Sequence, residues 1–180
     1  SQQECTAICQ ADDKCRGAVT YQPDTRYPAA ECRLNDGMTP NSPFEVTPPP
    51  PLYLSKALSD LNTYRSQYGL APVQLDIRLV DASERHAKDL AIHGIAAHDG
   101  TDGSSHADRA RRQGYEYRFI AENVATGQED WEKVFKAWQD SPGHNKNLLS
   151  EDAVDFGVAL VFEPTTKYIT YWAMLMGKPL

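Results

Sequence analysis

The sequence lacks two features that would each point to a large class of proteins. It has no apolar run close to the roughly 20 residues that a membrane-spanning helix needs. It also has no excess of basic residues, because 18 Lys and Arg stand against 25 Asp and Glu, for a net charge of −7. A nucleic-acid partner normally requires a basic face. We therefore expect neither a transmembrane segment nor a nucleic-acid partner.

Several catalytic signatures are missing as well. The sequence contains no G-x-S-x-G elbow to supply a serine nucleophile, and no H-E-x-x-H, P-loop or G-x-G-x-x-G pattern. Asp99 and Asp102 lie in a polar loop, but their spacing is not that of an EF-hand. These absences argue against a serine hydrolase, an H-E-x-x-H metalloprotease and a nucleotide-binding fold.

Cysteine is absent after residue 32, and the four cysteines before that point are Cys5, Cys9, Cys15 and Cys32. An even, clustered set in a segment too short to bury a core is typical of a disulfide staple. The alternative is a zinc knot, whose ligands usually come in close pairs, whereas the gaps here are three, five and sixteen residues. We expect disulfides, and with them a secreted protein in an extracellular or periplasmic compartment. Because the chain begins with Ser1, we also expect a removed leader or a trimmed sequence.

A proline-rich stretch divides the chain. Six of the twelve residues from Pro40 to Pro51 are proline. Proline fixes φ and removes a backbone donor, so an extended linker is expected there. We predict a cysteine-bearing piece over 1–37, a linker over 38–51 and a cysteine-free body over 52–180.

The body is expected to be an α+β domain. Apolar residues three or four positions apart predict amphipathic helices. These helices are expected to begin near Leu54, after Asp76, near Ser104, at Trp131 and, with Ser141 as the cap, at Pro142. Two β-rich runs, 155–162 and 167–176, predict an antiparallel hairpin. Helices first and paired strands last indicate packed layers and not a parallel sheet.

Three residues are the first candidates for chemistry. His98 begins a Gly/Asp-rich loop, where it either faces a cleft or bonds locally at the surface. Glu122 lies in an apolar run and needs a cation, a metal or backbone donors, because burying a lone carboxylate is costly. His144 follows a helix-starting proline, where a neutral ring is favoured that can ligate a metal or pack on Trp138.

The other histidines and the arginines are interpreted as structural. His86 lies on the apolar side of its predicted helix and is expected in the core, and His93 is expected at the surface. The sequence contains no nucleophile elbow that His106 could activate as the histidine of a serine-hydrolase triad. A local basic cluster is expected to be a solvated, salt-bridged face; its members are Arg109, Arg111, Arg112 and Arg118.

Seven short blocks then follow one another along the body. Three of them read A-H-x-G from residue 97, A-E-N-V-A from residue 121 and W-x-x-S-P-G-H-x-x-N-L-L from residue 138. With these blocks in order, residues 52–180 resemble the bacterial form of the CAP superfamily (cysteine-rich secretory, antigen-five and plant pathogenesis-related proteins). The resemblance implies a three-layer α–β–α sandwich.

The family has a central cleft with a tetrad of two histidines and two acids, which in some members binds zinc or another divalent cation. The resemblance assigns His98 to the first histidine, Glu122 to the glutamate and His144 to the second histidine. Ser141 stands where eukaryotic members carry the second acid, so the tetrad is incomplete. The implied metal ligands are His98 and His144. Supporting positions in the same blocks are Asn123, Trp138 and Asn147.

Residues 1–37 are similar to a shortened PAN/apple module. The similarity rests on C-x3-C-x5-C followed by a later C-x-L, and the leading strand of the module is missing. It implies nested pairing, Cys5 with Cys32 and Cys9 with Cys15, which is one of three connectivities open to four cysteines.

Three functions remain open. The first is a secreted, non-enzymatic binding protein for an extracellular protein, a glycan or, from the resemblance, a lipid. The second is a metal-dependent hydrolase of peptide or cell-wall polymer, in which histidines hold zinc or another divalent cation and Glu122 is the catalytic base. The third is a structural surface protein whose tetrad braces the fold. The missing nucleophile and the incomplete tetrad favour the first.

Overall fold

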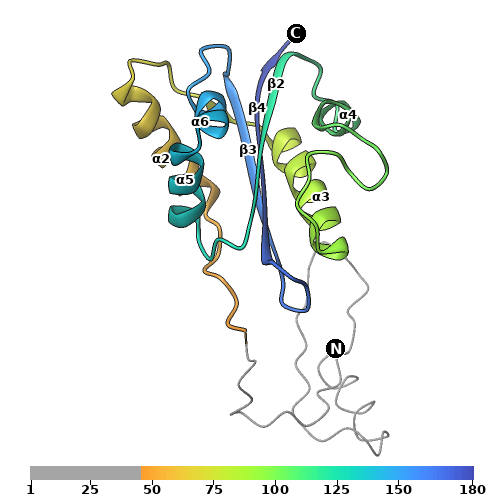
Figure 1. The fold of residues 1–180 in the computed structure, drawn as a ribbon. Helices are drawn as coiled ribbons and strands as arrows, with labels where there is room; N and C mark the ends of the chain where they lie inside the picture. The colour runs from red at the N-terminus through yellow and green to blue at the C-terminus, as the bar shows by residue number, and fades with distance from the viewer. Residues whose placement is uncertain (1–45) are drawn as a thin grey trace, which may run out of the picture. The chain divides into compact units, whose positions relative to one another are not determined.

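A computed structural model of the chain describes residues 46–180 (Figure 1). The predicted cysteine module over 1–37, including its four cysteines, and the first part of the linker lie outside these residues. Residues 46–53 contain four consecutive prolines and form neither helix nor strand. Pro48–Leu180 form one compact unit, and its first helix follows residue 53 directly.

Five helices lie within residues 46–180, and each begins within two residues of its predicted start. They are α2 (Leu54–Gln67), α3 (Ile77–His93), α4 (His106–Arg112), α5 (Trp131–Asp140) and α6 (Pro142–Leu148). Asp76 caps α3 by accepting a 2.9 Å hydrogen bond from the Arg78 amide, and Gly94 ends it in the left-handed conformation. Ser141 precedes α6 as predicted, but its side chain makes no cap hydrogen bond. None of these helices is long and apolar enough to cross a membrane.

The sheet has four strands in the described residues. They are β1 (Gln74–Leu75), β2 (Tyr117–Thr126), β3 (Asp155–Glu163) and β4 (Ile169–Pro179), in the spatial order β1-β3-β4-β2. Strands β3 and β4 form the predicted antiparallel hairpin, and β2 pairs antiparallel with the other edge of β4. The short β1 pairs parallel with β3, so the sheet is mixed. Strand β2 was not predicted from the sequence.

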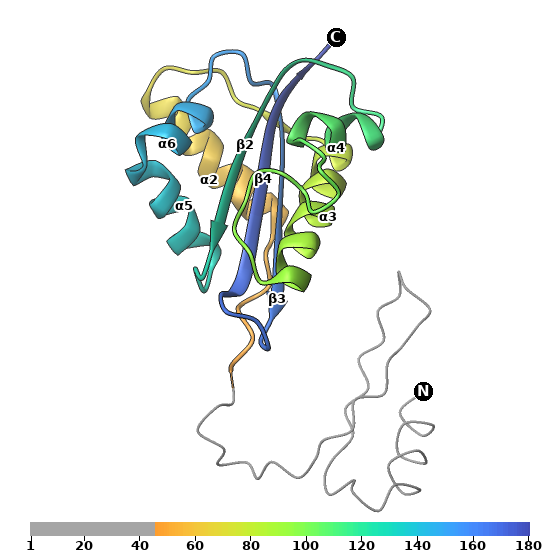
Figure 2. The ribbon, with the colours of Figure 1, turned by 45° about the vertical axis from the view of Figure 1, so that its right-hand side comes forward.

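Helices cover both faces of the sheet (Figures 1 and 2). Helices α2, α5 and α6 lie on one face, and α3 and α4 lie on the other. Strand β4 alternates between the two cores: Trp172 and Met174 pack with α2 and α5, whereas Leu175 packs under α3 and α4. This is the three-layer α+β arrangement that was predicted.

Helix α3 approaches β3 unusually closely at Gly157. A Cβ atom at this position would lie 2.3 Å from the Val80 amide nitrogen and 2.4 Å from the Leu79 carbonyl carbon. The Ser83 hydroxyl donates a 3.3 Å hydrogen bond to the Gly157 carbonyl, also across this contact. Because the atoms in the way belong to backbone, only glycine allows α3 to lie at this depth.

Candidate functional site

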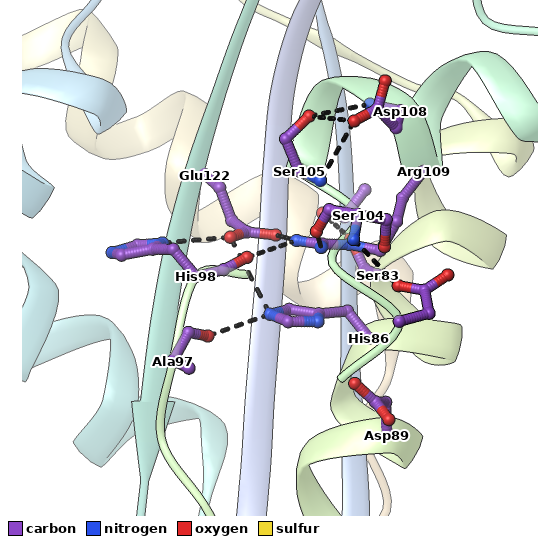
Figure 3. A network of polar contacts seen from close by, with 12 residues as sticks. Ser83, His86, Asp89, Ala97, His98, Ser104, Ser105, Asp108, Arg109 and Glu122 are labelled. Carbon is purple, nitrogen blue, oxygen red and sulfur yellow. Dashed lines mark hydrogen bonds and ion pairs between the residues drawn. The ribbon is translucent and has the colours of Figure 1, made fainter. Parts of the chain in front are cut away.

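Glu122 is the centre of a buried polar network (Figure 3). It lies on β2 opposite Leu175, and its side chain is 1% exposed. Its Oε2 accepts a 2.6 Å hydrogen bond from Arg109 Nη2, and its Oε1 lies 3.0 Å from His98 Nδ1. Both carboxylate oxygens are therefore engaged. The sequence predicts that Glu122 needs a partner, and the structure supplies two.

Arg109 is the residue that sequence reasoning placed wrongly. It was grouped with solvated arginines, but its side chain on α4 is 6% exposed. Besides Glu122, it donates to the backbone carbonyls of Ser104 at 2.7 Å and His98 at 2.9 Å. One guanidinium thus ties the 98–104 loop to β2. The neighbouring Arg111 and Arg112 are about half exposed, as expected.

His98 combines the two positions that the sequence allowed for it, one at the surface and one facing a polar site. Its side chain is 59% exposed, yet it reaches the buried Glu122 carboxylate. The hydrogen bond to Glu122 raises the pKa of His98 above its usual range, against the opposing effects of burial and Arg109. Burial works to raise the pKa of Glu122, but His98 and Arg109 outweigh it and hold this pKa below its usual range. The carboxylate stays ionised at neutral pH.

The raised pKa of His98 predicts a pH-dependent contribution to stability. Protonated His98 stabilises the fold fully below its unfolded pKa of about 6.5, and this contribution is lost as the pH rises through the higher folded-state pKa. The difference in unfolding free energy between the wild type and His98→Gln should therefore shrink from pH 5.5 to pH 8, as followed by urea denaturation. A difference independent of pH would contradict the His98–Glu122 interaction.

His86 lies buried beside the network, in the predicted core position. Its Nε2 lies 3.0 Å from the Ala97 carbonyl and 3.9 Å from Glu122 Oε1. Its Nδ1 has no hydrogen-bond partner within residues 46–180, so this core histidine is only half satisfied. Burial lowers the pKa of His86. His93 is exposed as predicted, and burial lowers the pKa of the partly buried His106.

Side-chain hydrogen bonds of Asn123 on β2 and Asn147 on α6 join these two elements. Asn123 Nδ2 donates to the His144 carbonyl at 3.1 Å. Asn147 Nδ2 donates to the Glu122 carbonyl at 3.1 Å and to Asn123 Oδ1 at 2.8 Å. Burial, and the charge of the nearby His98, lower the pKa of the His144 ring. Among the hydrogen bonds of residues 46–180, none joins the His144 ring to Glu122; the contact of His144 with this strand is the one from its backbone carbonyl to Asn123.

The residues present do not fit a divalent cation. Within residues 46–180, no group of three or more His, Cys, Asp or Glu side chains converges as metal ligands. The Glu122 carboxylate is already paired with the Arg109 guanidinium, and the partly buried Ser141 offers only a hydroxyl.

Trp138, a supporting position predicted from the sequence, is buried, and its indole N–H lacks a partner among the described residues.

The three-layer fold, with a histidine–glutamate network on β2 next to α6, is that of a CAP domain. The chain belongs to the cysteine-rich secretory protein (CAP) family, whose family model matches residues 58–176. It is 29% identical over 146 residues to YkwD, an uncharacterized protein of Bacillus subtilis (strain 168). The match covers 81% of this chain and 54% of that protein, so the chain spans about half the length of this relative.

Solved structures share the fold. An extracellular protein containing an SCP domain from Bacillus anthracis is 24% identical with a TM-score of 0.61, over 69% of this chain and 39% of that one. An outer surface protein from Borrelia burgdorferi is 21% identical with a TM-score of 0.64, over 71% of this chain and 92% of that one. At such identities the likeness concerns the fold.

Proposed function

We propose that this chain is a secreted, non-enzymatic binding protein, and that the Glu122 network braces its CAP domain instead of performing catalysis. The observation that carries the proposal is the engagement of both Glu122 oxygens, by Arg109 at 2.6 Å and by His98 at 3.0 Å. Through Arg109, the same network ties the 98–104 loop to the sheet.

The hydrolase alternative requires the opposite electrostatics. A general base works best when its pKa lies near the working pH and when one of its oxygens is free to take a proton. The pKa of Glu122 is instead held below its usual range, and Arg109 occupies the oxygen that His98 does not. A cation held at His98 and His144 would also lie beside the Arg109 charge. These features support binding over hydrolysis.

A secreted location is part of the same proposal. The clustered cysteines favour an oxidising compartment, and two proteins of the same fold are described as extracellular and as an outer surface protein. We place residues 1–37 in this scheme as a PAN/apple-like module, paired Cys5–Cys32 and Cys9–Cys15, that contacts protein or glycan.

Metal analysis combined with a hydrolysis assay tests the proposal. The purified full chain should contain no stoichiometric zinc and should bind added zinc more weakly than micromolar. It should cleave neither casein nor peptidoglycan in the presence of zinc above the level of the Glu122→Gln variant. Micromolar, stoichiometric zinc binding that disappears in His98→Ala, together with cleavage that disappears in Glu122→Gln, would refute it.

The positive arm of the test is a combined glycan and lipid array. The full chain should give a signal above background on at least one ligand class. A chain that binds nothing on either array would count against the binding function.

A further inference from the structure

A furrow runs between α2 and α5, on the face of the sheet opposite to α3 and α4 (Figures 1 and 2). Three contacts join the two helices across it: Lys56 with Glu132 at 3.1 Å, Trp131 with Asp60 at 2.8 Å, and the ring of Tyr64 with that of Phe135 at 5.8 Å between centroids. Contacts near the start of α2 meet the start of α5, and the later one meets its middle. The two helices therefore run in the same direction.

Two hollows follow one another along this furrow. The first, of about 210 Å³, lies at the starts of both helices, and Pro50 and Pro51 line it together with Trp131. The second, of about 360 Å³, lies further along both helices; its lining residues are Asp60, Thr63, Tyr64, Gln67, Phe135 and Gln139. The chain's own proline run thus lies against one end of the furrow, and the second hollow continues beyond it.

Aromatic rings form the floor of the furrow. Trp131 and Phe135 are stacked with their centroids 4.9 Å apart, and Tyr64 meets Phe135 edge-on at 83°. Trp131 is 6% exposed and Phe135 is 8% exposed, so neither presents the broad free face on which a sugar ring stacks. Aromatic-lined grooves are instead the usual docking site of proline-rich segments. The floor therefore favours pyrrolidine rings over a glycan.

The two walls of the second hollow carry matching hydrogen-bond donors. Gln67 on α2 and Gln139 on α5 each have a side-chain amide that makes no hydrogen bond within residues 46–180. A proline run has backbone carbonyls to accept from such amides but no N–H of its own. An acyl chain would use neither amide, and it would stay partly in water because Thr63 and Gln67 on the rim are exposed.

The length of the second hollow suits a short proline segment. A helix rises 1.5 Å per residue, so the step from Asp60 to Gln67 spans about 10 Å. A polyproline II helix rises about 3.1 Å per residue. Three to four prolines would therefore fill the hollow, at about 10 Å for the set.

The charges on and beside the first hollow have an acidic surplus. Four carboxylates stand against two lysines, which leaves a net charge of −2: Lys56 pairs with Asp60 and Glu132, and Lys133 pairs with Glu129 and Asp130. Further along α5, Lys136 and Asp140 pair with each other. Because Asp60 also lines the second hollow, this surplus favours a basic residue beside the bound prolines.

We propose that the furrow between α2 and α5 binds a proline-rich segment of a partner protein, in the polyproline II conformation and flanked by a basic residue. The prolines pack on Tyr64 and Phe135, and Gln67 and Gln139 donate to their carbonyls. The basic flank lies toward Asp60. The inference rests on the proposed binding function and names the class of its partner.

A peptide titration of the full chain tests the site, with octaproline flanked by one arginine at each end as the probe. This peptide should bind at least about tenfold more tightly than the same peptide with alanine in place of proline. Glutamate in place of the arginines should weaken binding. In ¹⁵N-labelled protein, the side-chain amide resonances of Gln67 and Gln139 should shift as the proline peptide is added.

The double variant Gln67→Ala with Gln139→Ala removes both donors from the helix surfaces. It should raise the Kd for the proline peptide at least about tenfold, the effect of two hydrogen bonds. Gln74→Ala with Gln113→Ala is the matched control, because it removes two glutamines that do not line the furrow. It should change this Kd less than twofold.

Three outcomes would overturn the inference: a proline peptide that binds no better than the alanine peptide, a double variant that binds like the control, or amide resonances that respond to laurate or maltotetraose but not to the proline peptide. In each case the binding function survives if the glycan and lipid arrays give a signal. If no probe binds and the arrays are also silent, the binding function fails with the inference.

Discussion

Glu122→Ala is expected to lower the free energy of unfolding by about 3–5 kcal/mol, because it leaves the Arg109 guanidinium buried without its carboxylate. Arg109 is 6% exposed and its Nη2 lies 2.6 Å from Glu122 Oε2. The desolvated cation cannot turn to water without releasing the carbonyls of Ser104 and His98. Urea denaturation followed by circular dichroism measures the loss.

Two further variants separate a buried ion pair from a general effect of substitution. Asp140→Ala breaks the exposed pair with Lys136 on α5 and should cost less than about 1 kcal/mol. The double variant Glu122→Leu with Arg109→Met removes the unpaired buried charge and should recover part of the stability lost in Glu122→Ala. Recovery is incomplete because the carbonyls of Ser104 and His98 lose their donor. If Glu122→Ala costs no more than Asp140→Ala, the network does not brace the fold.

Gly157→Ala is expected to cost more than about 3 kcal/mol, above the usual range for an added methyl group in a core. The new Cβ would lie 2.3 Å from the Val80 amide nitrogen and 2.4 Å from the Leu79 carbonyl carbon. No side-chain rotation relieves a clash with backbone, so α3 has to move away from β3. Thermal and urea unfolding should both show the loss.

Gly143→Ala on α6 is the matched control for this substitution. No atom lies within 4 Å of a Cβ built at Gly143. Alanine there should leave stability unchanged or raise it by at most about 1 kcal/mol. Equal effects of the two substitutions would contradict the close approach of α3 and β3.

The helices were predictable because their signals are local. Asp76 and Gly94 bracket α3 in the sequence, and the same two residues cap it in the structure. Strand β2 was not predicted because it lacks a clean alternation: Glu122 and Asn123 are neighbours that point to opposite faces, yet both are buried. A strand that alternates strictly between core and solvent would expose one of these two side chains to water.

The need of Glu122 for a partner was predictable from the sequence, but the identity of its partners was not. The sequence alone indicated that a buried Glu122 needs a partner, and His98 was one of the residues considered for the same site. The choice of Arg109 over its neighbours Arg111 and Arg112 depends on how α4 packs on β2, thirteen residues away from Glu122 in the chain. The sequence also could not predict that only one ring nitrogen of His86 has a hydrogen-bond partner in residues 46–180, because this depends on the position of the Ala97 carbonyl.

The position of β4 in the sheet has a consequence for biosynthesis. Strand β4 is the partner of both β2 and β3, and it follows both of them along the chain. A ribosome or a translocation channel releases the chain from its N-terminal side, so β2 emerges with no strand to pair with until β4 follows. The apolar faces of the earlier helices therefore have no completed sheet to cover in the nascent chain. Closure of the domain is a late event in its synthesis.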